Sequence, residues 1–96
     1  RDGVWDGRSI LPTGWVDFAR TGTKAAGGEN YGAGWWLAPP PGRTKLPLDV
    51  FSAQGHEGQL ITVVPSRDLV VVRLGASIYI DAWNQAEFIA NIQDAI

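Results

Sequence analysis

The second half of the chain holds three short apolar runs, at residues 50–54, 59–64 and 69–74. Runs of this length that are rich in valine and isoleucine and bounded by turn residues are typical of β-strands. Residues 65–68 (PSRD) separate the last two runs, and so short a connection brings consecutive strands together antiparallel. The pattern therefore predicts an antiparallel sheet, with Arg67 and Asp68 as ordinary turn residues.

Most positions in the last two runs, QLITVV and LVVVRL, are apolar instead of alternating with polar ones. Strands of this kind are usually covered on both faces. A helix predicted at residues 81–96 supplies one cover, and Asp81 is a favourable N-cap for it. Its apolar stripe comprises Phe88, Ile89, Ile92 and Ile96. No other segment of the chain is large enough to cover the second face of the sheet.

Glycine and proline break the first half of the chain into short segments. Asp-Gly pairs within residues 2–11 predict a small hairpin or an ordered loop. Pro12 suits the first turn of a helix, which we predict at residues 12–21. One face of that helix would carry Trp15, Phe18 and Ala19.

The middle of the chain begins with a small, polar loop at residues 21–30. The aromatic segment 31–37 (YGAGWWL) then favours a strand with close backbone approach, and we expect Trp35 and Trp36 to pack in the core and at a domain interface. The prolines of residues 38–47 predict an exposed excursion without regular structure.

These elements predict one partial domain of the α+β class over residues 1–96. A hairpin or loop and a short N-terminal helix fill residues 1–30, antiparallel strands fill 31–75, and the C-terminal helix fills 81–96. The sheet would have about three to four strands, with the C-terminal helix packed on one face. The chain starts at Arg1 and contains no methionine, so we expect it to derive from a longer translation product.

Composition narrows the chemistry that the chain can perform. It contains no cysteine, which excludes disulfides and thiolate catalysis, and a single histidine argues against a zinc site. A net charge of −2 without blocks of one sign gives no basis for binding nucleic acid. No apolar run approaches the roughly 18 residues of a membrane span. Periplasmic, secreted and cytoplasmic locations all remain compatible with this composition.

The single histidine, His56, lies between Gly55 and Gly58, just before the most apolar part of the chain. One interpretation is structural: a histidine at a strand edge makes a local hydrogen bond, and the glycines allow a bulge. The other is a strand lining a substrate site, where small residues let backbone N–H groups approach a ligand. Ser52 and Ser66 flank the region, but neither lies in a known nucleophile motif.

Four pieces of the chain carry a resemblance: residues 3–16 (GVWDGRSILPTGWV), 31–37, 51–75 (FSAQGHEGQLITVVPSRDLVVVRLG) and the final helix. In this order they resemble the C-terminal part of serine β-lactamases and penicillin-binding-protein-like hydrolases. The most similar branch contains class C β-lactamases, carboxylesterases and nylon-oligomer hydrolases. The resemblance implies amide or ester hydrolysis through an acyl-serine, without metal or cofactor. A β-lactam, an ester, a peptide or a linear amide are all possible substrates.

The resemblance also implies roles for residues around one pocket. His56, Glu57 and Gly58 match the family's third motif, Lys-Thr-Gly or its His-x-Gly variant, which lies on a strand bordering the pocket. By this match His56 helps to position the substrate and the proton-transfer groups, and Gly58 keeps the strand flat against the substrate. The backbone N–H of Gln59 would be one oxyanion-hole donor. Glu57 is a weak substrate contact, and we expect its side chain to be exposed.

Two family motifs are missing from this chain, because neither Ser-x-x-Lys nor Tyr-x-Asn occurs in it. We therefore expect the isolated chain to be inactive, since it lacks the nucleophile and the proton shuttle. Its expected partner is the N-terminal part of the same hydrolase, or a second copy of the chain in a homo-oligomer. The other hypothesis is a non-catalytic binding or self-associating module derived from the same fold.

Overall fold

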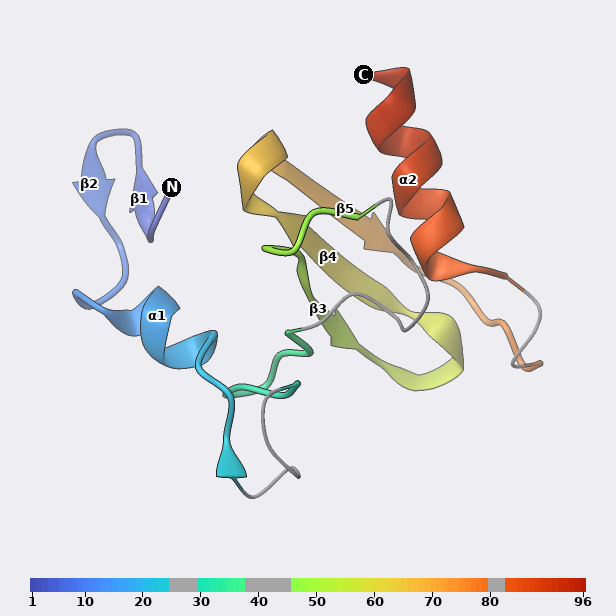
Figure 1. Ribbon diagram of the computed structural model, residues 1–96, viewed down its shortest axis with the longest axis horizontal. Helices are drawn as coiled ribbons and strands as arrows, with labels where there is room; N and C mark the ends of the chain where they lie inside the picture. The colour runs from blue at the N-terminus through green and yellow to red at the C-terminus, as the bar shows by residue number, and fades with distance from the viewer. Residues whose placement is uncertain (25–29, 38–45, 80–82) are drawn as a thin grey trace.

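A computed structural model describes residues 1–24, 30–37, 46–79 and 83–96. Two antiparallel sheets, one of two strands and one of three, are accompanied by a short N-terminal helix and a longer C-terminal helix (Figure 1). The predicted α+β class is confirmed. The elements are β1 (Val4–Trp5), β2 (Arg8–Ser9), α1 (Trp15–Ala19), β3 (Phe51–Gln54), β4 (Leu60–Val64), β5 (Leu69–Arg73) and α2 (Gln85–Ala95), with 3₁₀ turns at His56–Gly58 and Pro65–Arg67.

The central sheet has the strand order β3-β4-β5, and both pairs of neighbours are antiparallel. The three strands predicted from the apolar runs are confirmed to within one residue at each end. The predicted turn at residues 65–68 is also confirmed. Asp68 takes a left-handed conformation there with φ 47°, which aspartate tolerates better than most residues.

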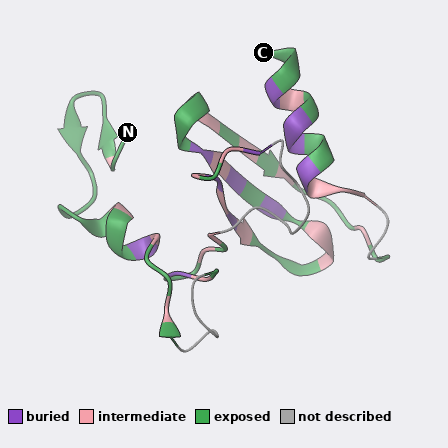
Figure 2. Ribbon diagram, in the orientation of Figure 1, coloured by how far each residue is buried: buried purple, intermediate pink, exposed green. Residues whose placement is uncertain are grey.

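Helix α2 covers one face of the central sheet, and the main core lies between them (Figure 2). Val64 of β4 and Ile89 of α2 are both 0% exposed. The predicted apolar stripe is buried only in part, since Ile89 is buried and Ile92 half-buried, whereas Phe88 is 42% and Ile96 77% exposed. Its buried residues are Ala86, Ile89, Ala90 and Gln93.

The N-cap of α2 is Asn84, whose side-chain oxygen accepts a hydrogen bond from the backbone N–H of Glu87 at 3.1 Å. An asparagine N-cap satisfies one of the unpaired N–H groups of the first helical turn. The predicted cap, Asp81, lies outside the described residues. Trp83 and Asn84 are not helical, however, so the predicted helix start was too early.

The opposite face of the central sheet, here called the open face, is not covered by α2. By the register of the strands it comprises Phe51, Ala53, Ile61, Val63, Val70 and Val72. Val70 is 59% and Val72 57% exposed. Phe51, Ala53 and Val63 are half-buried, and Phe51 is contacted by the Trp35 ring and by the guanidinium of Arg20. The expectation that the chain covers one face of the sheet only therefore holds in part.

The N-terminal segment forms the predicted hairpin. Asp6 and Gly7 connect β1 to β2 with positive φ angles of 47° and 71°, as an Asp-Gly turn of the mirror-image type requires. Helix α1 follows but is shorter than predicted, since it begins at Trp15 after a left-handed Gly14. Trp5 remains 64% exposed, so the hairpin buries little of its own apolar surface (Figure 2).

Residues 31–37 do not form the predicted strand. Glycines at positions 32 and 34 bend the segment, and Tyr31 forms an isolated bridge with Trp36. Trp36 exchanges two backbone hydrogen bonds with Ser52, at 2.8 and 2.9 Å, so a single residue extends the sheet beyond β3. The Trp35 ring packs edge-on against Phe51, with the ring centroids 5.0 Å apart.

Neither helix in the described parts of the chain combines the length and the apolar character needed to cross a membrane.

Candidate functional site

The motif His56-Glu57-Gly58 forms the tight connection between β3 and β4. It is a tight turn closed by a hydrogen bond from the Gln59 N–H to the His56 carbonyl, so the expectation that it lies on a strand is wrong. Glu57 and Gly58 both have positive φ angles, 56° and 79°. The chain reverses at this point because Gln54 pairs with Leu60, which leaves five residues to make the turn.

The side chain of His56 points into solvent and is 88% exposed. Its Nε2 atom lies 3.5 Å from Oε1 of Glu57, whose side chain is only 36% exposed. The expectation of an exposed Glu57 side chain therefore holds in part. The structural interpretation, a histidine at a strand edge beside a β-bulge, is also wrong, because the turn places His56 outside the sheet.

Gly58 is held where only glycine fits without strain. A Cβ atom at this position would lie 2.7 Å from Nε1 of Trp83 and 3.0 Å from a guanidinium nitrogen of Arg73. The left-handed φ of 79° adds a second reason for glycine. The structure thus gives Gly58 a packing role in a turn, and not the flat-strand role that the resemblance implied.

The backbone N–H of Gln59, the expected oxyanion donor, donates to the carbonyl of His56 at 3.3 Å. The Gln59 side chain donates to the same carbonyl, also at 3.3 Å. In this conformation the amide closes the turn. A substrate oxygen could accept a hydrogen bond from this N–H only by replacing the carbonyl oxygen of His56.

Arg73, at the end of β5, fastens the turn to the rest of the molecule. One of its guanidinium nitrogens donates to the carbonyl of Gly58 at 2.7 Å, and the other donates to the hydroxyl of Ser77. The guanidinium also lies over the ring of Trp83, 4.2 Å from its centroid. A cation stacked in this way on tryptophan gains electrostatic stabilisation from the face of the ring. No motif in the sequence indicated this arrangement.

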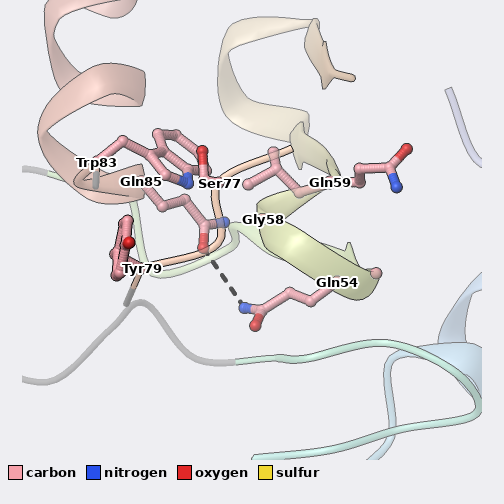
Figure 3. Close-up of a pocket in the computed structure, with 9 residues that line it drawn as sticks. Gln54, Gly58, Gln59, Ser77, Tyr79, Trp83 and Gln85 are labelled. Carbon is pink, nitrogen blue, oxygen red and sulfur yellow. Dashed lines mark hydrogen bonds between the residues drawn. The ribbon is translucent and has the colours of Figure 1, made fainter. Parts of the chain in front are cut away.

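A pocket of about 300 Å³ lies beside the turn, between the end of β3 and the start of α2 (Figure 3). Its lining contains the expected residues Gly58 and Gln59 but not His56 or Glu57. The other lining residues were not expected from the sequence: Gln54, Gly55, Leu60, Ser77, Tyr79, Trp83 and Gln85. The only possible signal was the pair of aromatic residues, Tyr79 and Trp83, just before the final helix.

Amide side chains meet across this pocket. Gln54 donates to Gln85 at 3.4 Å (Figure 3), and Gln85 donates to the hydroxyl of Thr62 at 3.3 Å. None of the described lining residues carries a carboxylate, an amine, a guanidinium or an imidazole. The chemistry of the pocket is therefore that of neutral donors and acceptors next to two aromatic rings.

Within the described ranges, no cluster of three or more histidine or acidic side chains is placed to hold a metal ion.

Comparison with known proteins adds no identification. A scan against protein-family models found no match, and a search of curated proteins found none either.

Proposed function

We propose that this chain is the C-terminal part of a serine hydrolase of the β-lactamase-like family. The complete enzyme would open an amide or an ester through an acyl-serine intermediate. This chain would supply the turn that carries His56 and Gly58, and the serine nucleophile would come from the N-terminal part of the same hydrolase. The order of the motifs from residue 3 onward supports the proposal.

The observation that carries the proposal is the open face of the central sheet. Val70 and Val72 on this face are more than half exposed, although the strands are almost continuously apolar. Burying such a surface is worth about 25 cal/mol per Å² of apolar area, so a further part of the enzyme packed there would be strongly stabilised. The pocket beside Gly58 lies at one end of the same sheet, on the side that α2 covers.

The open face also supports the second candidate function, a non-catalytic module that associates with itself or with another protein. Large exposed apolar patches mark interaction surfaces. The two proposals differ in one chemical respect, because only the hydrolase places a reactive serine next to this chain.

Native mass spectrometry of the purified protein, combined with fluorophosphonate labelling, separates the two functions. For the hydrolase we expect a larger companion chain bound one-to-one, with the label on a serine of that chain. A homo-oligomer or a single chain without label would overturn the hydrolase and leave the binding module.

The His56→Ala substitution tests the role of the turn in the complete hydrolase. We expect kcat/KM for a small ester to fall by roughly 100-fold, the lower end of what a positioned proton-transfer group supplies. Thermal stability should not change, because the side chain is 88% exposed. Arg67→Ala, in the exposed turn at the opposite end of β4, is the matched control. Equal turnover in both variants would remove His56 from the mechanism.

A further inference from the structure

The pocket beside Gly58 has a donor and acceptor pattern that selects one kind of chemical group. The side-chain amides of Gln54 and Gln85 approach each other there, and each offers both an N–H donor and a C=O acceptor. A ligand carboxamide has the same two functions in the same plane. It can therefore accept from one glutamine and donate to the other.

The existing hydrogen bonds of these two glutamines are long enough to be replaced. Gln54 donates to Gln85 at 3.4 Å and to Ser52 at 3.5 Å, whereas N–H···O bonds in proteins are commonest near about 2.9–3.0 Å. Because a side-chain NH2 has two donors and a carbonyl oxygen two acceptor positions, a ligand amide lying beside the pair can accept from Gln54 and donate to Gln85. The two side-chain amides therefore use only part of their hydrogen-bonding capacity in contacts within the protein.

The same pocket disfavours a charged group. None of its described lining residues carries a formal positive charge. The nearest guanidinium, that of Arg73, already donates to Gly58 and Ser77 and is stacked on Trp83. A carboxylate entering the pocket would lose part of its hydration without gaining an ionic partner, which costs more than burying a neutral amide that is hydrogen-bonded.

The aromatic residues and the size of the pocket complete the description. Trp83 and Tyr79 lie on one side of the glutamine pair (Figure 3), and they offer flat apolar surface to the part of a ligand next to its amide. A volume of about 300 Å³ is at the lower end of the range for ligand sites. It accommodates one group of a ligand with a short apolar arm.

We propose that this pocket binds an uncharged carboxamide attached to an apolar arm, and that it rejects the matching carboxylate. The inference rests on the proposed function, for which it names the substrate class: a neutral amide in preference to an anionic substrate. Gln54 and Gln85 bind the carboxamide, and Trp83 packs against the arm.

The test is an NMR titration of the purified, ¹⁵N-labelled protein with 3-phenylpropanamide and, separately, with 3-phenylpropanoate at neutral pH. The two probes differ only in the charged group. We expect the amide to shift the indole N–H signal of Trp83, assigned by its loss in Trp83→Phe, while that of Trp5 stays in place. The carboxylate should bind at least tenfold more weakly. Equal binding of both probes, or no shift of the Trp83 signal with the amide, would overturn the proposal.

Two substitutions locate the amide within the pocket. Gln54→Met and Gln85→Met keep the length of the side chain but remove its hydrogen bonds, and each should weaken amide binding about fivefold. Gln54 is exposed on its strand, so this variant remains informative if the loss of the Gln85 bond to Thr62 disturbs the fold. Asn91→Leu, on the exposed side of α2, is the control. Unchanged affinity in a folded Gln54→Met variant would overturn the assignment.

The titration requires no serine, and fluorophosphonate labelling requires no occupied pocket. Labelling without amide preference therefore contradicts this inference alone. Amide preference without labelling contradicts the hydrolase and leaves a module that binds carboxamides.

Discussion

At the scale of single residues, the turn between β3 and β4 shows what a glycine can be required for. Gly58 combines a left-handed backbone with contacts to Trp83 and Arg73, whereas Gly34 has a similar φ of 85° and open space where a Cβ would lie. The two positions share the backbone requirement and differ only in crowding. Alanine substitutions at the two positions therefore separate the cost of backbone strain from the cost of overpacking.

We expect Gly58→Ala to lower the free energy of unfolding by about 3 kcal/mol, and Gly34→Ala by about 1 kcal/mol. Left-handed φ costs alanine roughly 1 kcal/mol at both positions, and only at Gly58 does overpacking against Trp83 add roughly 1–3 kcal/mol. Urea unfolding followed by far-UV circular dichroism measures both losses. Equal losses would mean that Trp83 moves aside freely and does not constrain the turn.

At the scale of elements, α2 carries two adjacent apolar faces and buries only one. Phe88, Ile92 and Ile96 make one face, and Phe88 contacts Trp83 with their rings 5.7 Å apart. The other face, which contains Ile89 between two alanines, is the one that meets the sheet. Small residues on this face let the helix axis approach the strands closely, although its total apolar area is smaller.

The choice of face gives a prediction for two isoleucines of the same helix. Ile89→Ala should lower the free energy of unfolding by about 3 kcal/mol, because the side chain is 0% exposed and its removal leaves a cavity. Ile96→Ala should change it by less than about 0.5 kcal/mol, as expected for a residue that is 77% exposed. Thermal unfolding of the two variants measures the difference. A larger loss in Ile96→Ala would show that the buried face had been assigned incorrectly.

At the scale of the whole molecule, the side chains of Arg1 and Arg20 join the N-terminal segment to the part of the molecule that holds the central sheet. Arg1 forms a two-pronged ion pair with Asp68, at 3.0 and 2.6 Å, and Arg20 donates to the carbonyl of Asp49 at 3.1 Å. A groove of about 830 Å³ lies between the segment and the sheet. The attachment should therefore respond to pH and salt more readily than the core does.

The hydrogen bond from Arg1, followed by its charge, lowers the pKa of Asp68 below the ordinary value of 3.8. A lowered pKa in the folded state means that the ion pair stabilises the attachment above pH 3.8, and that this contribution is lost as the pH falls through the lower pKa. An NMR titration of the hairpin signals between pH 6 and 2 should follow the Asp68 carboxyl. High salt should weaken the effect, because both side chains are more than half exposed.

Asp68→Asn is the control for the titration, since asparagine also tolerates the left-handed φ of this residue. The hairpin signals should lose this transition in the variant. If the same transition persisted there, the ion pair would not be its cause.

Much of the fold could be predicted because it depends on local pattern. The strands β3 to β5, the hairpin at Asp6-Gly7 and the turn after β4 all follow from apolar runs and turn residues close together in the chain. The segment 31–37 misled the prediction, because its aromatic residues favour a strand while its glycines permit a bend, and contacts with β3 decided the outcome. The start of α2 was missed because two polar residues, Asp81 and Asn84, are both suitable caps.

The sequence by itself determined the α+β class, the three strands of the central sheet and the antiparallel pairing of β4 with β5, since each depends on neighbours in the chain. Only the tertiary structure decided which face of α2 is buried, why Gly58 cannot be larger and where the pocket lies. Those features join residues that are far apart in sequence, such as Gln54 with Gln85 and Gly58 with Trp83. Contacts of this kind follow from how the helix packs on the sheet, which no local periodicity encodes.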